Sequence, residues 1–162
     1  MDELSKIDPK TVVYVDESGI QEFYCRHYAY ALKGQKVNGK ISGKKYSRTN
    51  IVAGLQNGKI VAETLFKQNM EHNFFEDWFA NILLKNIPQG STIVLDRASF
   101  HRKKHLPMLA EKSACKVLFL SPYSPDFNPI EKYWANLKKF LRTNIHKYES
   151  LFLALHFYFK TG

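Results

Sequence analysis

The sequence predicts an α/β fold in which helices flank a mixed five-stranded sheet. Segments rich in apolar and β-branched residues alternate with segments of helical periodicity, in the order β, loop-rich insertion, β-hairpin, α, β, α, β, α, α. The first three strands can pair as a meander, because Asn57-Gly58, a strong hairpin signal, joins residues 46–56 to residues 59–66. The last two strands are each reached through a helix, which is typical of parallel strands joined by right-handed crossovers.

The N-terminal part is expected to begin with a strand and a basic insertion. Thr11–Val15 (TVVYV) has the composition of a buried strand. The sequence DESG at 16–19 predicts a turn directly after it, so that Asp16 lies at an edge of the sheet. Residues 21–45 mix aromatic residues with glycines and lysines, which predicts a strand-like segment followed by a basic loop. A surface hairpin without a functional role is the alternative for this segment.

The middle of the chain is expected to form a helix, a strand and a second helix. Residues 71–86 carry aromatic and apolar side chains at helical spacing, which predicts an aromatic stripe packed in the core. The short apolar run Thr92–Leu95 predicts a buried strand that places Asp96 at its C-terminal end. The helix expected over residues 102–112 contains Pro107, which predicts a kink or a break.

The C-terminal part predicts one more strand and two helices. Val117–Leu120 is an apolar strand that runs into the proline-rich turn SPYSPDFNP. A helix is expected over residues 129–143, and the apolar segment 149–160 forms a last short helix. The proline-rich turn can fold Glu131, in the first turn of the longer helix, back over the sheet edge that carries Asp96.

Length and charge limit the possible classes of function. A chain of 162 residues suits a single domain and can bury roughly 70% of the surface that its unfolded form exposes. The formal charge of +9, from 24 Lys and Arg against 15 Asp and Glu, favours a polyanionic partner, most simply nucleic acid. An ordinary basic surface is the alternative.

Cysteine usage and hydropathy exclude further classes. Cys25 and Cys115 form no CxxC motif and no Cys/His cluster, which argues against a zinc site and favours two buried, reduced thiols in a cytosolic protein. No stretch approaches the roughly 18 consecutive apolar residues of a membrane span. The polar N-terminus, with charges of both signs, is unlike a signal peptide. We therefore expect a cytoplasmic protein without a membrane partner.

Three acidic residues have structural reasons to meet. Asp16 and Asp96 follow apolar strands, and Glu131 opens a helix. Clustered carboxylates repel one another unless a cation neutralises them, and hard divalent cations prefer such oxygens. Two metal ions roughly 3.5–4 Å apart can stabilise both the attacking and the leaving oxygen of a phosphodiester. This chemistry suits a basic protein with an anionic substrate.

Each of these acids also has an explanation that needs no metal. Aspartates such as Asp16 and Asp96 commonly form turns after a strand. Glu131 would occupy the N3 position of its helix, where a glutamate supports the helix start. Glu17 and Asp126 are rival acids. Strand alternation directs Glu17 away from Asp16, and a local backbone hydrogen bond explains Asp126 within its turn.

Three sequence motifs carry a family resemblance. VDESG at 15–19, LDRASFHR at 95–102 and SPYSPDFNPIEKYWANLK at 121–138 resemble the catalytic core of mariner-type transposases, in particular their bacterial insertion-sequence branch. The resemblance extends from about residue 11 to residue 142. Between Asp96 and Glu131 lie 34 residues, the spacing of this group's Asp-Asp-Glu triad. The proline-rich block beside that spacing makes the match specific.

The resemblance implies a ribonuclease H-like fold and a single DDE catalytic domain over residues 1–162. It assigns Asp16, Asp96 and Glu131 as catalytic residues and as ligands of Mg²⁺, for which Mn²⁺ can substitute. It implies a Mg-dependent DNA transposase that cleaves phosphodiester bonds at transposon ends and joins the freed 3′-hydroxyl to target DNA. Cut-and-paste transfer into TA sites of double-stranded DNA, a homodimeric active complex and a nucleoid-associated location in a bacterium follow from the same resemblance.

Two features depart from the family pattern. Relatives usually carry Asn after the second acid, whereas this chain has Arg97, whose guanidinium could bind phosphate or perturb Asp96. Relatives also carry N-terminal helix-turn-helix DNA-binding segments, and no such segment is recognisable in this sequence. Two interpretations stay open: an isolated catalytic domain, or half of a transposase split over two reading frames, with DNA recognition supplied by a separate segment.

Basic residues near the acids are candidate nucleic-acid contacts, with a solvated face or local packing as the alternative for each. The candidates are Arg97, His101, Arg102, Lys132, Lys138, Lys139 and Arg142. Two other functions also stay open. One is a metal-dependent nuclease without joining activity, and the other is a catalytically inactive DNA-binding or dimerisation module.

Overall fold

A mixed five-stranded sheet runs through the computed structural model, which describes residues 6–21, 48–121 and 128–161. The strands β1, β2 and β3 pair antiparallel, whereas β4 pairs parallel with β1 and with β5. The sheet order is β3-β2-β1-β4-β5, so the meander and the two added parallel strands expected from the sequence are confirmed. The strands are β1 (Val12–Gln21), β2 (Arg48–Gln56), β3 (Lys59–Phe66), β4 (Thr92–Leu95) and β5 (Lys116–Phe119).

A two-residue turn at Asn57-Gly58 joins β2 to β3. Both residues have positive φ angles, 51° for Asn57 and 76° for Gly58, which is the conformation that such a hairpin turn requires. The side chains of Gln56 and Asn57 donate to the backbone oxygen of Lys10 at 3.2 and 3.3 Å. The predicted hairpin is therefore confirmed, and its turn is fastened to the segment that precedes β1.

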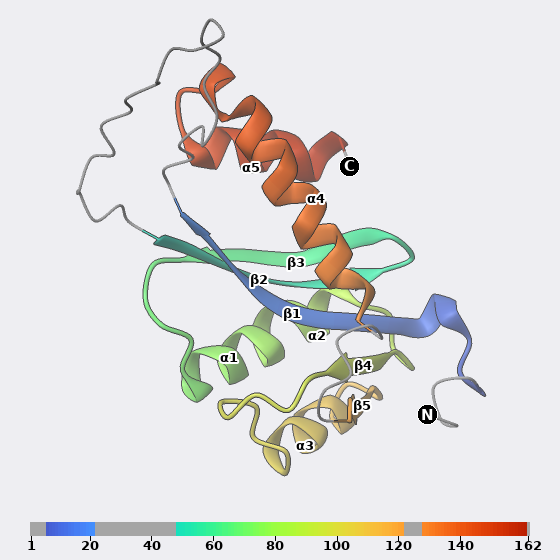
Figure 1. The fold of residues 1–162 in the computed structure, drawn as a ribbon. Coiled ribbons are helices and arrows are strands. Elements are labelled where there is room, and N and C mark those ends of the chain that lie inside the picture. Colours follow the sequence, from blue (N-terminus) through green and yellow to red (C-terminus); the bar gives the residue numbers. More distant parts are fainter. Residues whose placement is uncertain (1–5, 22–47, 122–127, 162) are drawn as a thin grey trace, which may run out of the picture.

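Helices cover both faces of the sheet (Figure 1). One face carries α1 (His72–Trp78), a π-helical turn (Phe79–Leu83), α2 (Leu84–Asn86) and α3 (His105–Glu111). The other face carries α4 (Pro129–Asn144) and α5 (Leu151–Thr161). None of the helices in the described part of the chain is long and apolar enough to cross a membrane.

Two apolar cores hold these layers together. The aromatic side chains of the α1 region pack against Val13 and Val15 of β1, as the predicted aromatic stripe requires. On the other face, α4 packs Trp134 and Leu137 against β1 and β2, where Ile20 contributes from β1. Because successive side chains of a strand point to opposite faces, β1 serves both cores.

The strand β1 does not end at Asp16, so the turn predicted at residues 16–19 is wrong. β1 continues to Gln21, and Asp16 is paired with Ala53 in the middle of the strand. The antiparallel pairing with β2 is unbroken as far as Gln21, and this ladder of hydrogen bonds overrides the local turn preference of Asp and Gly.

Pro107 neither kinks nor breaks its helix, so that prediction is also wrong. α3 begins at His105, later than expected, and Pro107 therefore lies in the first turn. Backbone N–H groups of a first turn have no partner within the helix, so a proline is tolerated there.

Some expectations fall outside the described residues. They concern the basic insertion after Gln21, the thiol of Cys25 and the rival acid Asp126. The other cysteine, Cys115, is a buried free thiol, as expected.

Truncation of Leu137 tests how firmly α4 is held against the sheet. Its side chain is fully buried, so Leu137→Ala should lower the free energy of unfolding by about 2–5 kcal/mol. Lys139→Ala, on the exposed side of the same helix, should change it by less than about 0.5 kcal/mol. Urea denaturation of both variants measures the difference, and equal midpoints would contradict the packing described here.

Candidate active site

The register of the parallel strands aligns Asp16 with Asp96. Tyr14 of β1 pairs with Val94 of β4, and each aspartate lies two residues further along its own strand direction. A step of two residues returns a side chain to the same face of a sheet, and neighbouring strands lie roughly 4.8 Å apart. The register therefore directs both aspartates to one place on one face, although Asp16 lies within its strand and Asp96 just beyond the end of β4.

The third acid comes from α4, which covers that face. Glu131 lies in the first turn, after Asn128 at the N-cap and Pro129 at the first helical position, as expected. The backbone N–H of Glu131 donates to Asn128 O at 3.1 Å, but the Asn128 side chain makes no capping bond. The buried neighbours Ile130 and Trp134 fix this end of α4 in the core.

The three acids share one electrostatic environment. Burial raises the pKa of Asp16 to about 7, and the negative charges of Glu17, Asp96 and Glu131 add to this rise, against a hydrogen bond with the Glu17 backbone. The charges of Asp96 and Glu131 therefore reach Asp16, as the alignment of the three elements requires. The Asp16 carboxylate lies where a positive charge would be stabilised.

His101 fixes the carboxylate of Asp96. Nδ1 of His101 lies 2.9 Å from Oδ1 of Asp96, and the backbone N–H of Ala98 donates to the same oxygen at 3.0 Å. The hydrogen bond from His101 lowers the pKa of Asp96. Partial burial acts in the opposite direction and raises this pKa, whereas the hydrogen bond from the Ala98 N–H lowers it further. Asp96 is therefore ionised and held in one orientation.

The His101 ring is enclosed, which corrects the expectation that it contacts nucleic acid. It packs between Phe75 and Phe100, with ring centroids 4.3 and 4.6 Å away, and none of its side chain is exposed. Burial opposes protonation of His101, but its hydrogen bond to Asp96 and the nearby Glu17 carboxylate outweigh burial and raise its pKa to about 9.

Glu17 completes this arrangement from the opposite face of β1. Its Oε1 lies 3.4 Å from Nε2 of His101, so the imidazole bridges Glu17 and Asp96. Strand alternation correctly directed Glu17 away from Asp16. The sequence did not indicate the bridge, because it depends on the loop after β4 bringing His101 beneath β1.

Two of the candidate DNA contacts are engaged within the protein. Nε of Arg97 donates to Leu120 O at 3.0 Å, which ties the residue after Asp96 to the end of β5. Nε of Arg102 lies 3.5 Å from a carboxylate oxygen of the buried Glu76 in α1. The remaining candidates lie on α4, where Lys132, Lys139 and Arg142 are exposed and Lys138 is partly buried. Their contact with DNA stays a prediction.

The donors present suit a hard divalent cation, although they do not form a closed ligand set. Among the described residues, no three His, Cys, Asp or Glu side chains are grouped closely enough to hold a metal ion. Asp96 is engaged by His101 and Ala98 instead. Carboxylate oxygens are nevertheless the ligands that Mg²⁺ and Mn²⁺ prefer, and burial together with the neighbouring carboxylates raises the pKa of Asp16.

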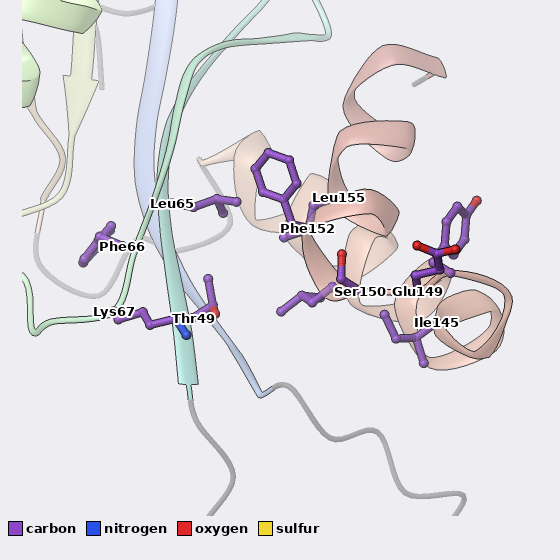
Figure 2. A pocket seen from close by; sticks show the side chains of 11 residues that line it. Thr49, Leu65, Phe66, Lys67, Ile145, Glu149, Ser150, Phe152 and Leu155 are labelled. Atoms are coloured by element: carbon purple, nitrogen blue, oxygen red, sulfur yellow. The ribbon is translucent and has the colours of Figure 1, made fainter.

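A cavity of about 560 Å³ lies apart from these acids, between the β2–β3 region and α5 (Figure 2). Phe152 and Leu155 of α5 face Leu65 of β3 across it. None of the three acids lines this cavity, so it is separate from the candidate active site.

One protein family matches most of the sequence. The sequence profile described as DDE superfamily endonuclease matches residues 11–151, which include all five strands and α4. No curated protein matches the chain.

Solved structures share the fold at low sequence identity. A chain of the Mos1 transposase paired-end complex with left transposon end has a TM-score of 0.71 at 19% identity, over 86% of this chain and 44% of that chain. The catalytic domain of Mos1 mariner transposase has a TM-score of 0.68 at 15% identity, over 99% and 75% of the two chains. A chain of a simian T-cell lymphotropic virus intasome has a TM-score of 0.56 at 12% identity, over 86% and 42%. The expected ribonuclease H-like fold is confirmed, and the chain spans less than half the length of the first of these matches.

Asp16→Asn should stabilise the metal-free protein at alkaline pH. The folded-state pKa is raised to about 7 from 3.8, so the stability associated with neutral Asp16 is complete below pH 3.8 and lost as the pH rises to 7. At about 1.4 kcal/mol per pKa unit, about 4 kcal/mol is the upper limit of the gain at pH 8.

Thermal unfolding in EDTA at pH 4 and pH 8 measures this effect. The melting temperature of Asp16→Asn should exceed that of the wild type at pH 8, with a much smaller difference at pH 4. Asp77→Asn, an exposed position on α1, is the matched control and should show no such pH dependence. A lower melting temperature for Asp16→Asn at pH 8 would show that Asp16 is not under electrostatic stress.

Proposed function

Because the chain belongs to the DDE superfamily endonucleases, we propose that it is the catalytic domain of a DNA transposase. The observation that carries this proposal is the β1–β4 register, which aligns Asp16 with Asp96 on the face that α4 covers with Glu131. The charge of +9 supports an anionic substrate. The structures of similar fold include a Mos1 transposase complex with a transposon end, which supports DNA as that substrate.

Asp16, Asp96 and Glu131 are the proposed ligands of Mg²⁺, with Mn²⁺ as a substitute. When bound, the divalent ions would supply Lewis acidity at the attacking and leaving oxygens of the phosphodiester. The two aspartates fix the position of this chemistry relative to the sheet, and Glu131 reaches it from α4. His101 keeps Asp96 ionised and oriented, so it acts as a positioning residue.

The proposed reaction consists of two displacements at phosphorus. A water oxygen attacks the phosphodiester at the transposon end, and the bond from phosphorus to the 3′-oxygen breaks, which leaves a 3′-hydroxyl and a 5′-phosphate. The freed 3′-hydroxyl then attacks a phosphodiester of the target DNA, which we expect at a TA site, and a target 3′-oxygen leaves. The same three carboxylates serve both displacements.

The proposed partners are double-stranded DNA and further protein. We propose a homodimer as the active complex, a separate N-terminal segment for recognition of the transposon ends, and a cytoplasmic, nucleoid-associated location. The Mos1 paired-end complex supports the assembly on DNA by its likeness of fold. The basic residues Lys132, Lys138, Lys139 and Arg142 of α4 are the proposed phosphate contacts nearest Glu131.

Asp16→Asn, Asp96→Asn and Glu131→Gln should each reduce metal-dependent cleavage by about 10³-fold or more, because each removes one anionic oxygen donor from a centre that acts as a unit. Glu111→Gln, exposed on α3, is the control and should retain full activity. Nicking of a supercoiled plasmid in Mg²⁺, Mn²⁺ or EDTA measures cleavage. Equal nicking by the wild type and the three variants would refute the assignment.

Joining distinguishes a transposase from a nuclease with the same acids. A labelled duplex that ends in a 3′-hydroxyl should become attached to the plasmid in the presence of Mn²⁺. Nicking without attachment would identify a metal-dependent nuclease, and binding without either product would identify an inactive DNA-binding module.

His101→Ala should lower cleavage by about 10- to 100-fold, the usual effect of losing a residue that orients a metal ligand. The Mg²⁺ concentration for half-maximal cleavage should rise, whereas DNA affinity in EDTA should stay unchanged, because the imidazole is buried. His101→Gln, which keeps a donor, should recover part of the activity. His105→Ala, a half-exposed histidine of α3, is the control. Loss of DNA affinity without a change in Mg²⁺ dependence would contradict this role.

A further inference from the structure

A basic groove lies beside the second half of β1. It has a volume of about 300 Å³ and is lined by Gly19 and Gln21 of β1, Arg48 of β2, and Lys138 and Arg142 of α4. Three of these five residues are cations and none is acidic. No salt bridge occupies the three cations within the described part of the chain. The groove therefore gathers three cations that no salt bridge among the described residues engages, although Arg48 also lines a neighbouring hollow that contains Glu17.

Gly19 makes room for Arg48 in this groove. A Cβ placed on Gly19 would collide with Nε, Nη2 and Cζ of Arg48. The two residues lie on neighbouring strands, since Arg48 pairs with Gln21, two positions along β1 from Gly19. The guanidinium therefore lies against the β1 backbone at Gly19. It lines one side of the groove, and α4 lines the other.

The groove lies further along α4 from the candidate active site. Lys138 and Arg142 follow Glu131 by seven and eleven residues, close to whole turns of an α-helix, so the three residues share one side of α4. At 1.5 Å per residue, Lys138 lies roughly 10 Å beyond Glu131 along the helix axis. Gly19 lies three residues beyond Asp16, roughly 10 Å along β1, and this odd step turns it to the face opposite Asp16. It is therefore α4 that leads from the acids to the groove, over roughly 10 Å.

We propose that the groove of Arg48, Lys138 and Arg142 binds backbone phosphates of the DNA strand, about three nucleotides from the phosphodiester held at the acids. A strand carries one phosphate per roughly 3.4 Å of helix axis, so a distance of roughly 10 Å corresponds to about three nucleotides. The planar guanidinium of Arg48 can donate two parallel hydrogen bonds to one phosphate. Contacts to phosphates carry no sequence information directly, so the contribution of this site is expected to be independent of sequence. The identity of the substrate rests on the proposed function; the anion site does not require cleavage.

DNA binding without cleavage tests this site. In EDTA, fluorescence anisotropy with a short labelled duplex should show that Arg48→Ala weakens binding about fivefold or more. The slope of log affinity against log salt should become shallower by about 0.9, the value for one lost phosphate contact. Lys112→Ala, exposed at the end of α3, removes the same charge elsewhere and should change affinity less than twofold. A second duplex of unrelated sequence should give the same result.

Gly19→Ala provides a variant that keeps every charge. Its new methyl group should displace the Arg48 guanidinium, a flexible side-chain end, and reproduce the loss of affinity. Added to Arg48→Ala, it should cause no further loss, because both changes act on one contact. Circular dichroism and melting temperatures verify that the variants are folded.

Two outcomes would overturn the proposal. One is an Arg48→Ala protein that binds like Lys112→Ala, and the other is full additivity of Gly19→Ala and Arg48→Ala. The same measurements in an Asp96→Asn background, which removes cleavage, should give the same differences. If the wild type does not nick DNA but Arg48→Ala and Gly19→Ala still weaken DNA binding, the proposed function would be rejected and the anion site would be retained.

Discussion

The parallel pairing of β1 with β4 is the constraint on which the candidate site depends. Only because Tyr14 lies beside Val94 do Asp16 and Asp96 emerge on the same face. A slip of one residue would send one of them to the opposite face. The fully buried side chains of β4, which would be exposed or displaced by such a slip, fix the register. Packing of α4 on that face then places Glu131 close enough for its charge to raise the pKa of Asp16, so the core determines the position of the charges.

The distribution of charge follows from this arrangement. The acidic centre lies within a chain whose net charge is +9, so its charge is opposite in sign to that of the whole chain. Burial, with a smaller contribution from the neighbouring carboxylates, raises the pKa of Asp16, and a bound cation would lower the cost of ionising it. In the proposed function, the basic residues on α4 and Arg48 would attract an anionic strand to a surface whose centre would otherwise repel it. His101 neutralises Asp96 and Glu17 from beneath without reaching solvent.

Much of the fold could be predicted from the sequence, because strand composition, helical periodicity and the Asn57-Gly58 turn are local signals. The turn predicted at residues 16–19 was wrong because tertiary pairing overrides a local preference, and the kink predicted at Pro107 was wrong because α3 begins later than expected. Gly19 was interpreted as part of a turn, yet it lies in a strand and accommodates Arg48. The three acids were proposed from two apolar strands, a helix start and a family resemblance, although Asp16 lies within its strand rather than at its end; their catalytic role stays a prediction. The partnership of His101 with Glu17 could not be predicted, because only the folded chain brings them together.

The two aspartates differ in the stiffness of their supports. Asp16 belongs to a long strand whose backbone is bonded to β2 on both sides of that position, and such a ladder opens only when a large part of the sheet unfolds. Asp96 stands on a loop beyond β4, and its orientation depends on hydrogen bonds from His101 and from the backbone N–H of Ala98. The sheet backbone thereby positions one carboxylate, and two hydrogen bonds position the other. Loss of the imidazole would therefore release Asp96 while leaving Asp16 in place, without deforming the sheet.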